Sequence, residues 1–113
     1  MSNKMILAIE TATSRSCVCL AIGGNLFHAS FDAPETQAAS LVLAIENLLK
    51  SNNIWYSDLT HLVTTIGPGS FTGIRIGLSV ARTIAFSNRS LIVRPVTTLE
   101  CLAAGYHDTA HTF

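Results

Sequence analysis

The sequence predicts an α/β fold in which helices cover a mixed five-stranded sheet, in the order β-β-β-α-β-α-β-α. Two observations predict it. Three short apolar runs joined by tight turns open the chain, which is typical of an antiparallel meander. Strand-like and helix-like segments then alternate, which is typical of βαβ crossovers in a parallel arrangement. At 113 residues the chain has the length of about one domain.

The first three strands are predicted from their apolar character and from the turns between them. Lys4–Ile9 is a short apolar run, and the polar stretch Glu10–Ser16 follows it as a turn. Cys17–Ile22 and Leu26–Phe31 are the next two strands. Gly23-Gly24-Asn25 between them is typical of a hairpin turn.

The spacing of apolar residues then changes from that of strands to that of a helix. A helix is predicted from about Thr36 to Asn52, ended by Asn52-Asn53. Its apolar stripe consists of Ala38, Leu41, Val42, Ile45, Leu48 and Leu49. His61–Ile66 is the fourth strand.

The second helix, from about Thr72 to Phe86, has apolar residues nearly all round. A surface helix packed on one sheet needs a single apolar stripe, so the other side of this helix needs something else to bury it. Leu91–Val96 is predicted as the fifth strand, although Pro95 lies near its end. Thr97 or Thr98 can cap a third helix that runs through Ala104.

Composition excludes several classes of function. Hydrophobic residues make up 49% and charged residues 12%, so we expect part of the surface to face a partner. A formal net charge of +0 disfavours strong direct binding of nucleic acid, which normally needs a basic surplus. No apolar run reaches the ~18 residues of a membrane span, and no signal peptide is apparent, so we expect a cytoplasmic protein. Cys17, Cys19 and Cys101 form no CxxC, and Cys17 and Cys19 are expected to be small buried side chains.

The stretch IGPGSFTGIRIG, residues 66–77, invites comparison with phosphate-binding loops. Gly67 and Gly69 open a GxGxxG pattern, but Gly73 falls one residue late, and the lysine of a P-loop is missing. Gly69, Gly73 and Gly77 are spaced four apart, so on a helix they line one side. Close packing against a neighbouring element therefore explains the glycines better, with Ser70 or Thr72 as the N-cap. A helix N-terminus still accepts an anion, which leaves that alternative open.

Other candidate sites have weaker patterns. His107 and His111 have the i, i+4 spacing of helical metal ligands but no third ligand nearby, so a frayed tail is favoured and no metal is expected. His28 and His61 are single histidines in strand patterns, and no catalytic triad can be identified. Glu10 ends a buried strand and precedes polar residues, which resembles a phosphate or metal turn. The candidate nucleotide-binding residues are Glu10, Thr11, Thr13 and Ser14.

Several motifs together resemble the TsaB (YeaZ) family. They are ILAIETAT (residues 6–13), the Cys17–Ile22 strand, PVTTL (residues 95–99) and the glycine turn. The residues of the glycine turn that carry the resemblance are Gly67, Pro68, Gly69, Ser70, Phe71, Thr72, Gly73, Arg75 and Gly77. The resemblance implies a ribonuclease-H-like, actin-like ATPase (Hsp70-like, or ASKHA) fold. It also implies a role in threonylcarbamoyl modification of adenosine 37 of tRNA, as the non-catalytic partner of the paralogue TsaD, alongside the ATPase TsaE.

The sequence departs from the family pattern at several positions. Glu10 stands where the family typically has Asp, and Glu35 where it often has His. The metal-binding HxxxH of the catalytic paralogue aligns with Thr98 and Leu102, which cannot replace histidine ligands. Residues 1–106 are expected to form one domain and residues 107–113 a tail, without the family's second domain. ATP with magnesium is then expected only at the interface of a complex.

We therefore favour an interaction subunit without catalytic residues, which binds TsaD through its two long helices or pairs with a second copy when TsaD is absent. An ATPase-fold nucleotide-binding protein, a glycoprotease-like enzyme and an inactive remnant are the alternatives. The residues expected to contact the partner are Leu41, Ile45, Leu48, Ile76, Val80 and Ile84. The sequence does not separate the side of each helix that faces the core from the side that faces the partner.

Overall fold

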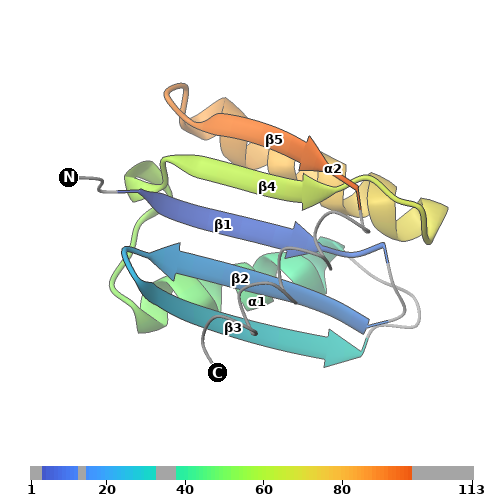
Figure 1. Ribbon diagram of the computed structural model, residues 1–113, viewed down its shortest axis with the longest axis horizontal. Helices are drawn as coiled ribbons and strands as arrows, with labels where there is room; N and C mark the ends of the chain where they lie inside the picture. Colours follow the sequence, from blue (N-terminus) through green and yellow to red (C-terminus); the bar gives the residue numbers. More distant parts are fainter. Residues whose placement is uncertain (1–3, 13–14, 33–37, 98–113) are drawn as a thin grey trace.

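The computed structural model describes residues 4–12, 15–32 and 38–97. The strands form one five-stranded sheet in the spatial order β3-β2-β1-β4-β5, and both long helices lie behind it in Figure 1. This mixed sheet with crossover helices is the predicted fold class. The third predicted helix and the predicted tail lie outside the described residues.

The first three strands form the predicted antiparallel meander. They are β1 (Met5–Glu10), β2 (Arg15–Ile22) and β3 (Asn25–Asp32). β2 pairs antiparallel with both of its neighbours. Gly23 in the turn has a φ of 61°, a left-handed conformation that glycine adopts without steric cost. The hairpin is therefore as tight as the two glycines predict.

The second half of the chain supplies the parallel part of the sheet. α1 (Ala38–Ser51) leads to β4 (His61–Thr65), and α2 (Phe71–Ser87) leads to β5 (Ile92–Val96). β4 pairs parallel with β1 on one side and with β5 on the other. β5 is an edge strand, which is where a strand containing Pro95 is tolerated.

A short 3₁₀ helix, η1 (Tyr56–Asp58), lies between α1 and β4 and was not predicted. Its position depends on Asn88 at the end of α2, whose amide nitrogen donates to the carbonyl oxygens of Tyr56 (3.0 Å) and Leu59 (3.1 Å). Asn88 is distant in sequence from both residues, so local sequence patterns could not reveal this contact.

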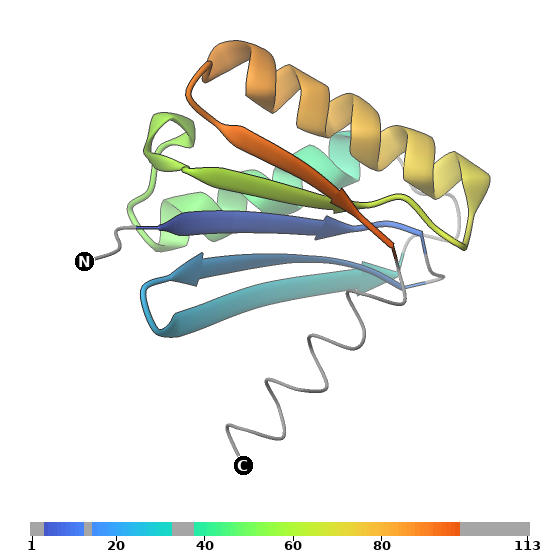
Figure 2. The same ribbon diagram turned by 45° about the horizontal axis from the view of Figure 1, so that its top comes forward.

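The hydrophobic core lies between the helices and one face of the sheet (Figure 2). Leu7, Leu20 and Leu62 come from three adjacent strands, and Leu41 and Ile45 of α1 pack above them. All five side chains are fully buried. At about 1.5–3 kcal/mol for each fully buried side chain, this layer contributes substantially to the stability of the fold. The opposite face of the sheet has neither described helix on it (Figure 2).

Candidate functional site

The glycine turn connects the end of β4 to the first turn of α2. Ser70 is the N-cap, because its Oγ accepts a hydrogen bond from the backbone N–H of Gly73 at 3.1 Å. This bond satisfies one of the backbone donors that every helix leaves free at its start. Of the two predicted caps, Ser70 is therefore confirmed, and Thr72 lies inside the helix.

The glycines spaced four apart face the chain that leaves β1. A Cβ atom on Gly69 would overlap the carbonyl of Ala12, and one on Gly73 would overlap the carbonyl of Thr11. A Cβ atom on Gly77 would lie 2.6 Å from Oγ1 of Thr11, closer than side chains normally approach. The predicted close packing is thus confirmed, and the neighbour is the Thr11-Ala12 backbone.

Hydrogen bonds hold the two segments together. The N–H of Ser70 donates to the carbonyl of Ala12 at 2.6 Å, and the buried Thr11 hydroxyl donates to the carbonyl of Gly73 at 2.6 Å. The Glu10 carboxylate accepts from the N–H of Ala12 at 2.7 Å. The N–H groups of Ser70 and Gly73 are thus already used within the chain, so a phosphate bound to them would have to displace these bonds.

The structure describes two of the four candidate nucleotide-binding residues. Glu10 and Thr11 lie at this junction, while Thr13 and Ser14 lie outside the described residues. The nucleotide role stays a prediction. Arg75 of the turn motif is exposed, and its guanidinium lies 5.5 Å from the centre of the Phe71 ring. Such a distance permits a cation–π contact.

The residues expected to contact a partner lie mostly inside this chain, and that expectation is corrected here. Leu41 and Ile45 are fully buried between α1 and the sheet. Leu48, Val80 and Ile84 are also core residues, and the sixth, Ile76, is half-buried against the core. Burial within the chain leaves these side chains little area for another protein. The sequence could not tell the core-facing side of each helix from the partner-facing side. The structure shows that the sides of α1 and α2 that carry these residues face the core.

A groove of about 370 Å³ runs between α1 and α2. Val80 and Ile84 contribute to its lining, and Ser79, Thr83 and Ser87 are exposed along the α2 side. The α1 side is formed by Ala38, Val42 and Glu46, and Tyr56 of η1 completes the lining. Small side chains on both helices leave room for a further helix to approach closely.

The electrostatics of this groove are set by one acidic residue and one phenol. Burial raises the pKa of Tyr56 above its usual 10.0, and the negative charge of Glu46 raises it further. Tyr56 is therefore neutral at physiological pH, and its hydroxyl is available as a hydrogen-bond donor or acceptor. The groove thus combines an apolar floor with few polar groups, as binding clefts commonly do.

Large apolar side chains are exposed on the two helices and just beyond α1. On α2, Phe71 is 72% exposed and Phe86 is 86% exposed. On the α1 side, Leu43 is 58% exposed and Trp55, just after the helix, is 76% exposed. Aromatic side chains are enriched in protein interfaces, so these residues are better candidates for partner contact than the predicted core residues. Their position could not be read from the sequence, because helical spacing alone does not say which stripe faces the sheet.

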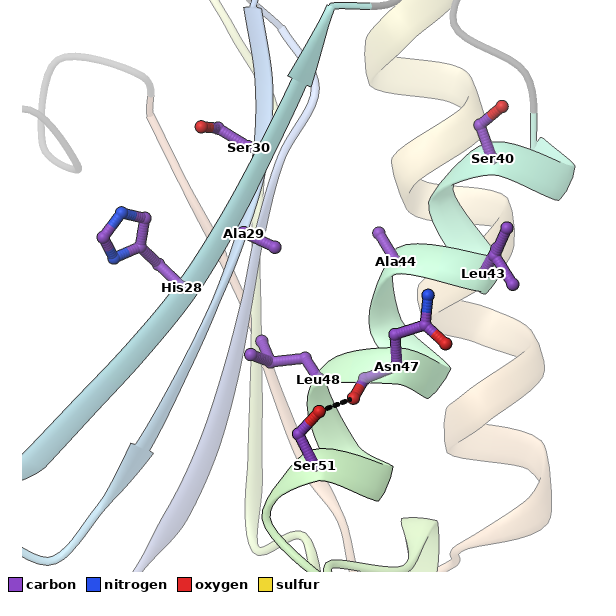
Figure 3. Close-up of a pocket in the computed structure, with 9 residues that line it drawn as sticks. All are labelled: His28, Ala29, Ser30, Ser40, Leu43, Ala44, Asn47, Leu48 and Ser51. Atoms are coloured by element: carbon purple, nitrogen blue, oxygen red, sulfur yellow. Dashed lines mark hydrogen bonds between the residues drawn. The ribbon is translucent and has the colours of Figure 1, made fainter.

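A second hollow, of about 550 Å³, lies between β3 and α1 (Figure 3). Ala29 points toward Ala44 and Leu43 of the helix, whereas His28 and Ser30 point to the other side of the strand (Figure 3). The Ser51 hydroxyl donates to the carbonyl of Asn47 at 2.7 Å, so this hydrogen bond lies within α1. The hollow has few polar groups that converge on one point, and it resembles an open sheet edge more than a ligand site.

Cys17 and Cys19 are half-buried on the face of the sheet that points away from the helices. The expectation of buried side chains is therefore only partly correct. Cys19 is the cross-strand partner of His28. A hydrogen bond from Cys17 lowers the pKa of Cys19 to about 6, burial opposes this shift, and the charge of His28 adds to the lowering. Alternation within the strand placed both thiols on one face, but only the hairpin register brings His28 to them.

The described part of the chain has neither a metal-ligand cluster nor a helix that could span a membrane. Within residues 4–12, 15–32 and 38–97, no three His, Cys, Asp or Glu side chains are grouped so as to hold a metal ion. His107 and His111 lie outside these ranges, so the expectation about them stays a prediction. None of the described helices is long and apolar enough to cross a membrane.

Comparison with known proteins identifies similar chains. Residues 32–112 match the family model described as TsaD, tRNA N6-adenosine threonylcarbamoyltransferase. A protein of Haemophilus influenzae named tRNA threonylcarbamoyladenosine biosynthesis protein TsaB is 31% identical over 103 residues. These residues are 91% of this chain but 43% of that protein, so the chain spans less than half the length of that relative.

Solved structures show the same architecture. YeaZ from Pseudomonas aeruginosa is 28% identical, with a TM-score of 0.85, and the match covers 95% of this chain and 50% of that one. A Bacteroides thetaiotaomicron protein described as having an actin-like ATPase fold is 11% identical, with a TM-score of 0.60 over 92% of this chain and 38% of that one. At that identity the second likeness concerns the fold alone. Together they confirm the predicted ribonuclease-H-like, actin-like fold class.

Proposed function

The chain belongs to the TsaB (YeaZ) group of the family whose TsaD model it matches, and we propose that it serves threonylcarbamoyladenosine biosynthesis on tRNA as a non-catalytic partner subunit. Its direct partner would be TsaD, with TsaE as a further member of the complex. In the absence of TsaD, a second copy would occupy the same surface. The proposed role implies a cytoplasmic protein.

The observation that carries this proposal is the open groove between α1 and α2. Its lining includes the small residues Ala38, Ser79 and Ser87, which allow another helix to come close. Phe86 lies one residue before Ser87 on α2 and is almost fully exposed, so it is available as an apolar anchor beside the groove. A helix of TsaD packed between α1 and α2 would bury both features.

Two features favour a non-catalytic role over a catalytic one. Thr98 and Leu102 stand where the resemblance to the catalytic paralogue requires histidine ligands. The donors at the start of α2 already serve contacts within the chain, through the Ser70 and Gly73 N–H groups. ATP and magnesium would then belong to a site completed by the partner.

The rim of the groove gives a sharper test than its core. A charge at Val80 would unfold the chain, because that side chain is 6% exposed in the core. Thr83 is exposed and lines the groove, so Thr83→Glu would place a carboxylate where the partner packs. We expect this variant to lose co-purification with TsaD while it keeps the circular dichroism spectrum of the unaltered chain.

The matched control is Arg82→Glu, because Arg82 is exposed on α2 but does not line the groove. This variant should co-purify with TsaD as well as the unaltered chain does. Equal co-purification of folded Thr83→Glu would rule out the groove as the interface. A failure of both the unaltered chain and the control to bind TsaD would reject the partner proposal itself.

A further inference from the structure

β3 forms one edge of the sheet, and within the described residues no strand lies on its outer side (Figure 1). Residues 26–31 read LFHASF, with neither proline nor an Asp, Glu, Lys or Arg, and their register with β2 skips no residue. Natural edge strands usually carry a charged residue, a proline or a bulge that prevents pairing with another strand. The other edge strand, β5, contains Arg94 and Pro95. Of the two edges, β3 is therefore the one suited to accept a further strand.

The backbone groups that face outward from β3 follow from its hairpin with β2. Ile22 and Asn25 flank a two-residue turn and are cross-strand partners. Residues that close such a turn exchange hydrogen bonds, and hydrogen-bonded pairs then alternate along an antiparallel ladder. Phe27 therefore bonds to β2, whereas the N–H and C=O groups of Leu26 and His28 are directed away from β2. These groups can form a ladder with a strand added at the edge.

The hollow of about 550 Å³ between β3 and α1 lies at this same edge, on the helix side of the sheet (Figure 3). Ala29 points toward Ala44 and Leu43 of α1, and Leu43 is 58% exposed. Phe27 lies on the same side of the strand as Ala29, because side chains two residues apart share a face, and it is 36% exposed. A strand added beside β3 would project every second side chain over this hollow.

The occupant that fits this edge is a second copy of β3. A two-fold axis at His28 places each His28 opposite the same residue of the other copy, and each Phe27 opposite Ala29 of the other copy. The outward-directed N–H and C=O groups of His28 are those that this register joins. The large Phe27 ring of each copy then enters the hollow that the small side chains of Ala29 and Ala44 leave in the other. Residues 26–31 carry no like charges that would oppose the pairing.

We propose that two copies of this chain pair antiparallel through their β3 strands, with the two-fold axis at His28, so that their sheets become one continuous sheet. The inference does not depend on the proposed function. The groove proposed for TsaD is lined by Val42 and Glu46 of α1, whereas the hollow is lined by Leu43 and Asn47, so a partner in the groove leaves the β3 edge accessible. One strand pair and one hollow make a small interface, so we expect a dissociation constant of about 1–100 μM.

Equilibrium centrifugation of the full chain carrying Thr83→Glu measures this pairing alone, because that substitution blocks association through the groove. His28 is exposed, so charged substitutions there should leave the fold intact, as circular dichroism can verify. His28→Glu and His28→Lys should each raise the dissociation constant at least about tenfold, because each places two like charges directly opposite one another. Thr72→Glu is the control, because it adds the same charge at an exposed position of α2 and should leave the constant unchanged.

A mixture of the two His28 variants tests the register. In a mixed dimer the glutamate of one copy faces the lysine of the other, so an equimolar mixture should dimerise at least as tightly as the unsubstituted His28 chain. Only an axis at residue 28 brings these two positions together.

The hollow is tested by Phe27→Ala, which keeps the strand but removes the ring that enters the other copy. We expect the dissociation constant to rise at least about tenfold. Leu26→Ala removes an apolar side chain from the opposite face of the same strand, away from the hollow, and should have a smaller effect.

The contrary outcomes are equally definite. A chain that stays monomeric at about 1 mM would leave the edge to another protein or to another segment of the chain, and the proposal would be wrong. Dimers that persist in folded His28→Glu would place the contact elsewhere, and a mixture that stays monomeric would exclude an axis at His28. If a His28 variant fails to fold, the unsubstituted chain and Phe27→Ala still decide, since unchanged dimerisation of Phe27→Ala would exclude the hollow from the contact.

Discussion

The glycine turn and α2 together carry two lines of small residues, one packed against another part of the chain and one open, and the contrast separates structural surface from candidate interaction surface. Gly69 and Gly73 pack against the Thr11-Ala12 backbone, and Gly77 packs against the Thr11 side chain, at distances that exclude even a methyl group. Ser79 and Ser87 border the groove toward α1, which no described segment fills. Small residues at helical spacing therefore indicate close approach, but only the fold tells whether the neighbour belongs to the same chain.

The largest expected effect on stability tests the packed glycines Gly69, Gly73 and Gly77. Gly73→Ala would place a Cβ atom within the carbonyl of Thr11, and the backbone on both sides would have to move. We expect a loss of about 3 kcal/mol or more in the free energy of unfolding, measured by urea denaturation. Gly24→Ala is the control, because no atom lies within 4 Å of the new Cβ there. A Gly73→Ala chain as stable as the control would show that the two segments are not in tight contact.

The next largest effect comes from a substitution that removes a hydrogen bond rather than adding an atom. Thr11→Val keeps the shape of the side chain but leaves the carbonyl of Gly73 without its buried donor. We expect a loss of about 1–3 kcal/mol on urea denaturation. Thr83→Val removes an exposed hydroxyl that bonds only the carbonyl of Ser79 within the same helix, so its effect should stay within about 0.5 kcal/mol. Equal losses in the two variants would contradict a special role for the junction.

The same contrast explains how far sequence reasoning reached. The strands, the two long helices and the Ser70 cap follow from local patterns, and the structure has them within a few residues of the predicted bounds. The close packing of the glycines was also predictable, because glycine inside a helix is costly unless something requires it. What the glycines contact was not predictable, since Thr11 and Gly73 are far apart in the sequence.

The candidate partner surface was harder to predict for a related reason. Ile45 and Val80 lie on apolar stripes of two helices, and a stripe that faces the sheet has the same spacing as one that faces a partner. Exposed Phe86 and Trp55 do not belong to either stripe, so periodicity could not select them. The dependence of η1 on Asn88 is a third contact between distant residues, and it too lies beyond local patterns.

The smallest expected effect concerns the open groove between α1 and α2 and the negative charge of Glu46, which lines it. Glu46→Gln removes the lesser of the two causes that raise the pKa of Tyr56, so this pKa should fall but stay above 10.0 because burial remains. Spectrophotometric titration with Tyr106→Phe as background leaves Tyr56 as the only tyrosine. Arg82→Gln, on the part of α2 that does not line the groove, should leave the titration unchanged.

The linked effect on stability has a definite sign. A pKa raised in the folded state stabilises the chain below the unfolded pKa of 10.0, and this contribution is lost as the pH rises through the higher folded value. The free energy of unfolding should therefore fall above pH 10, and the fall should be shallower in Glu46→Gln. A Tyr56 pKa at or below 10.0 in the unaltered chain would show that the phenol is fully hydrated. The groove between α1 and α2 would then be a solvated surface rather than a site where a partner packs.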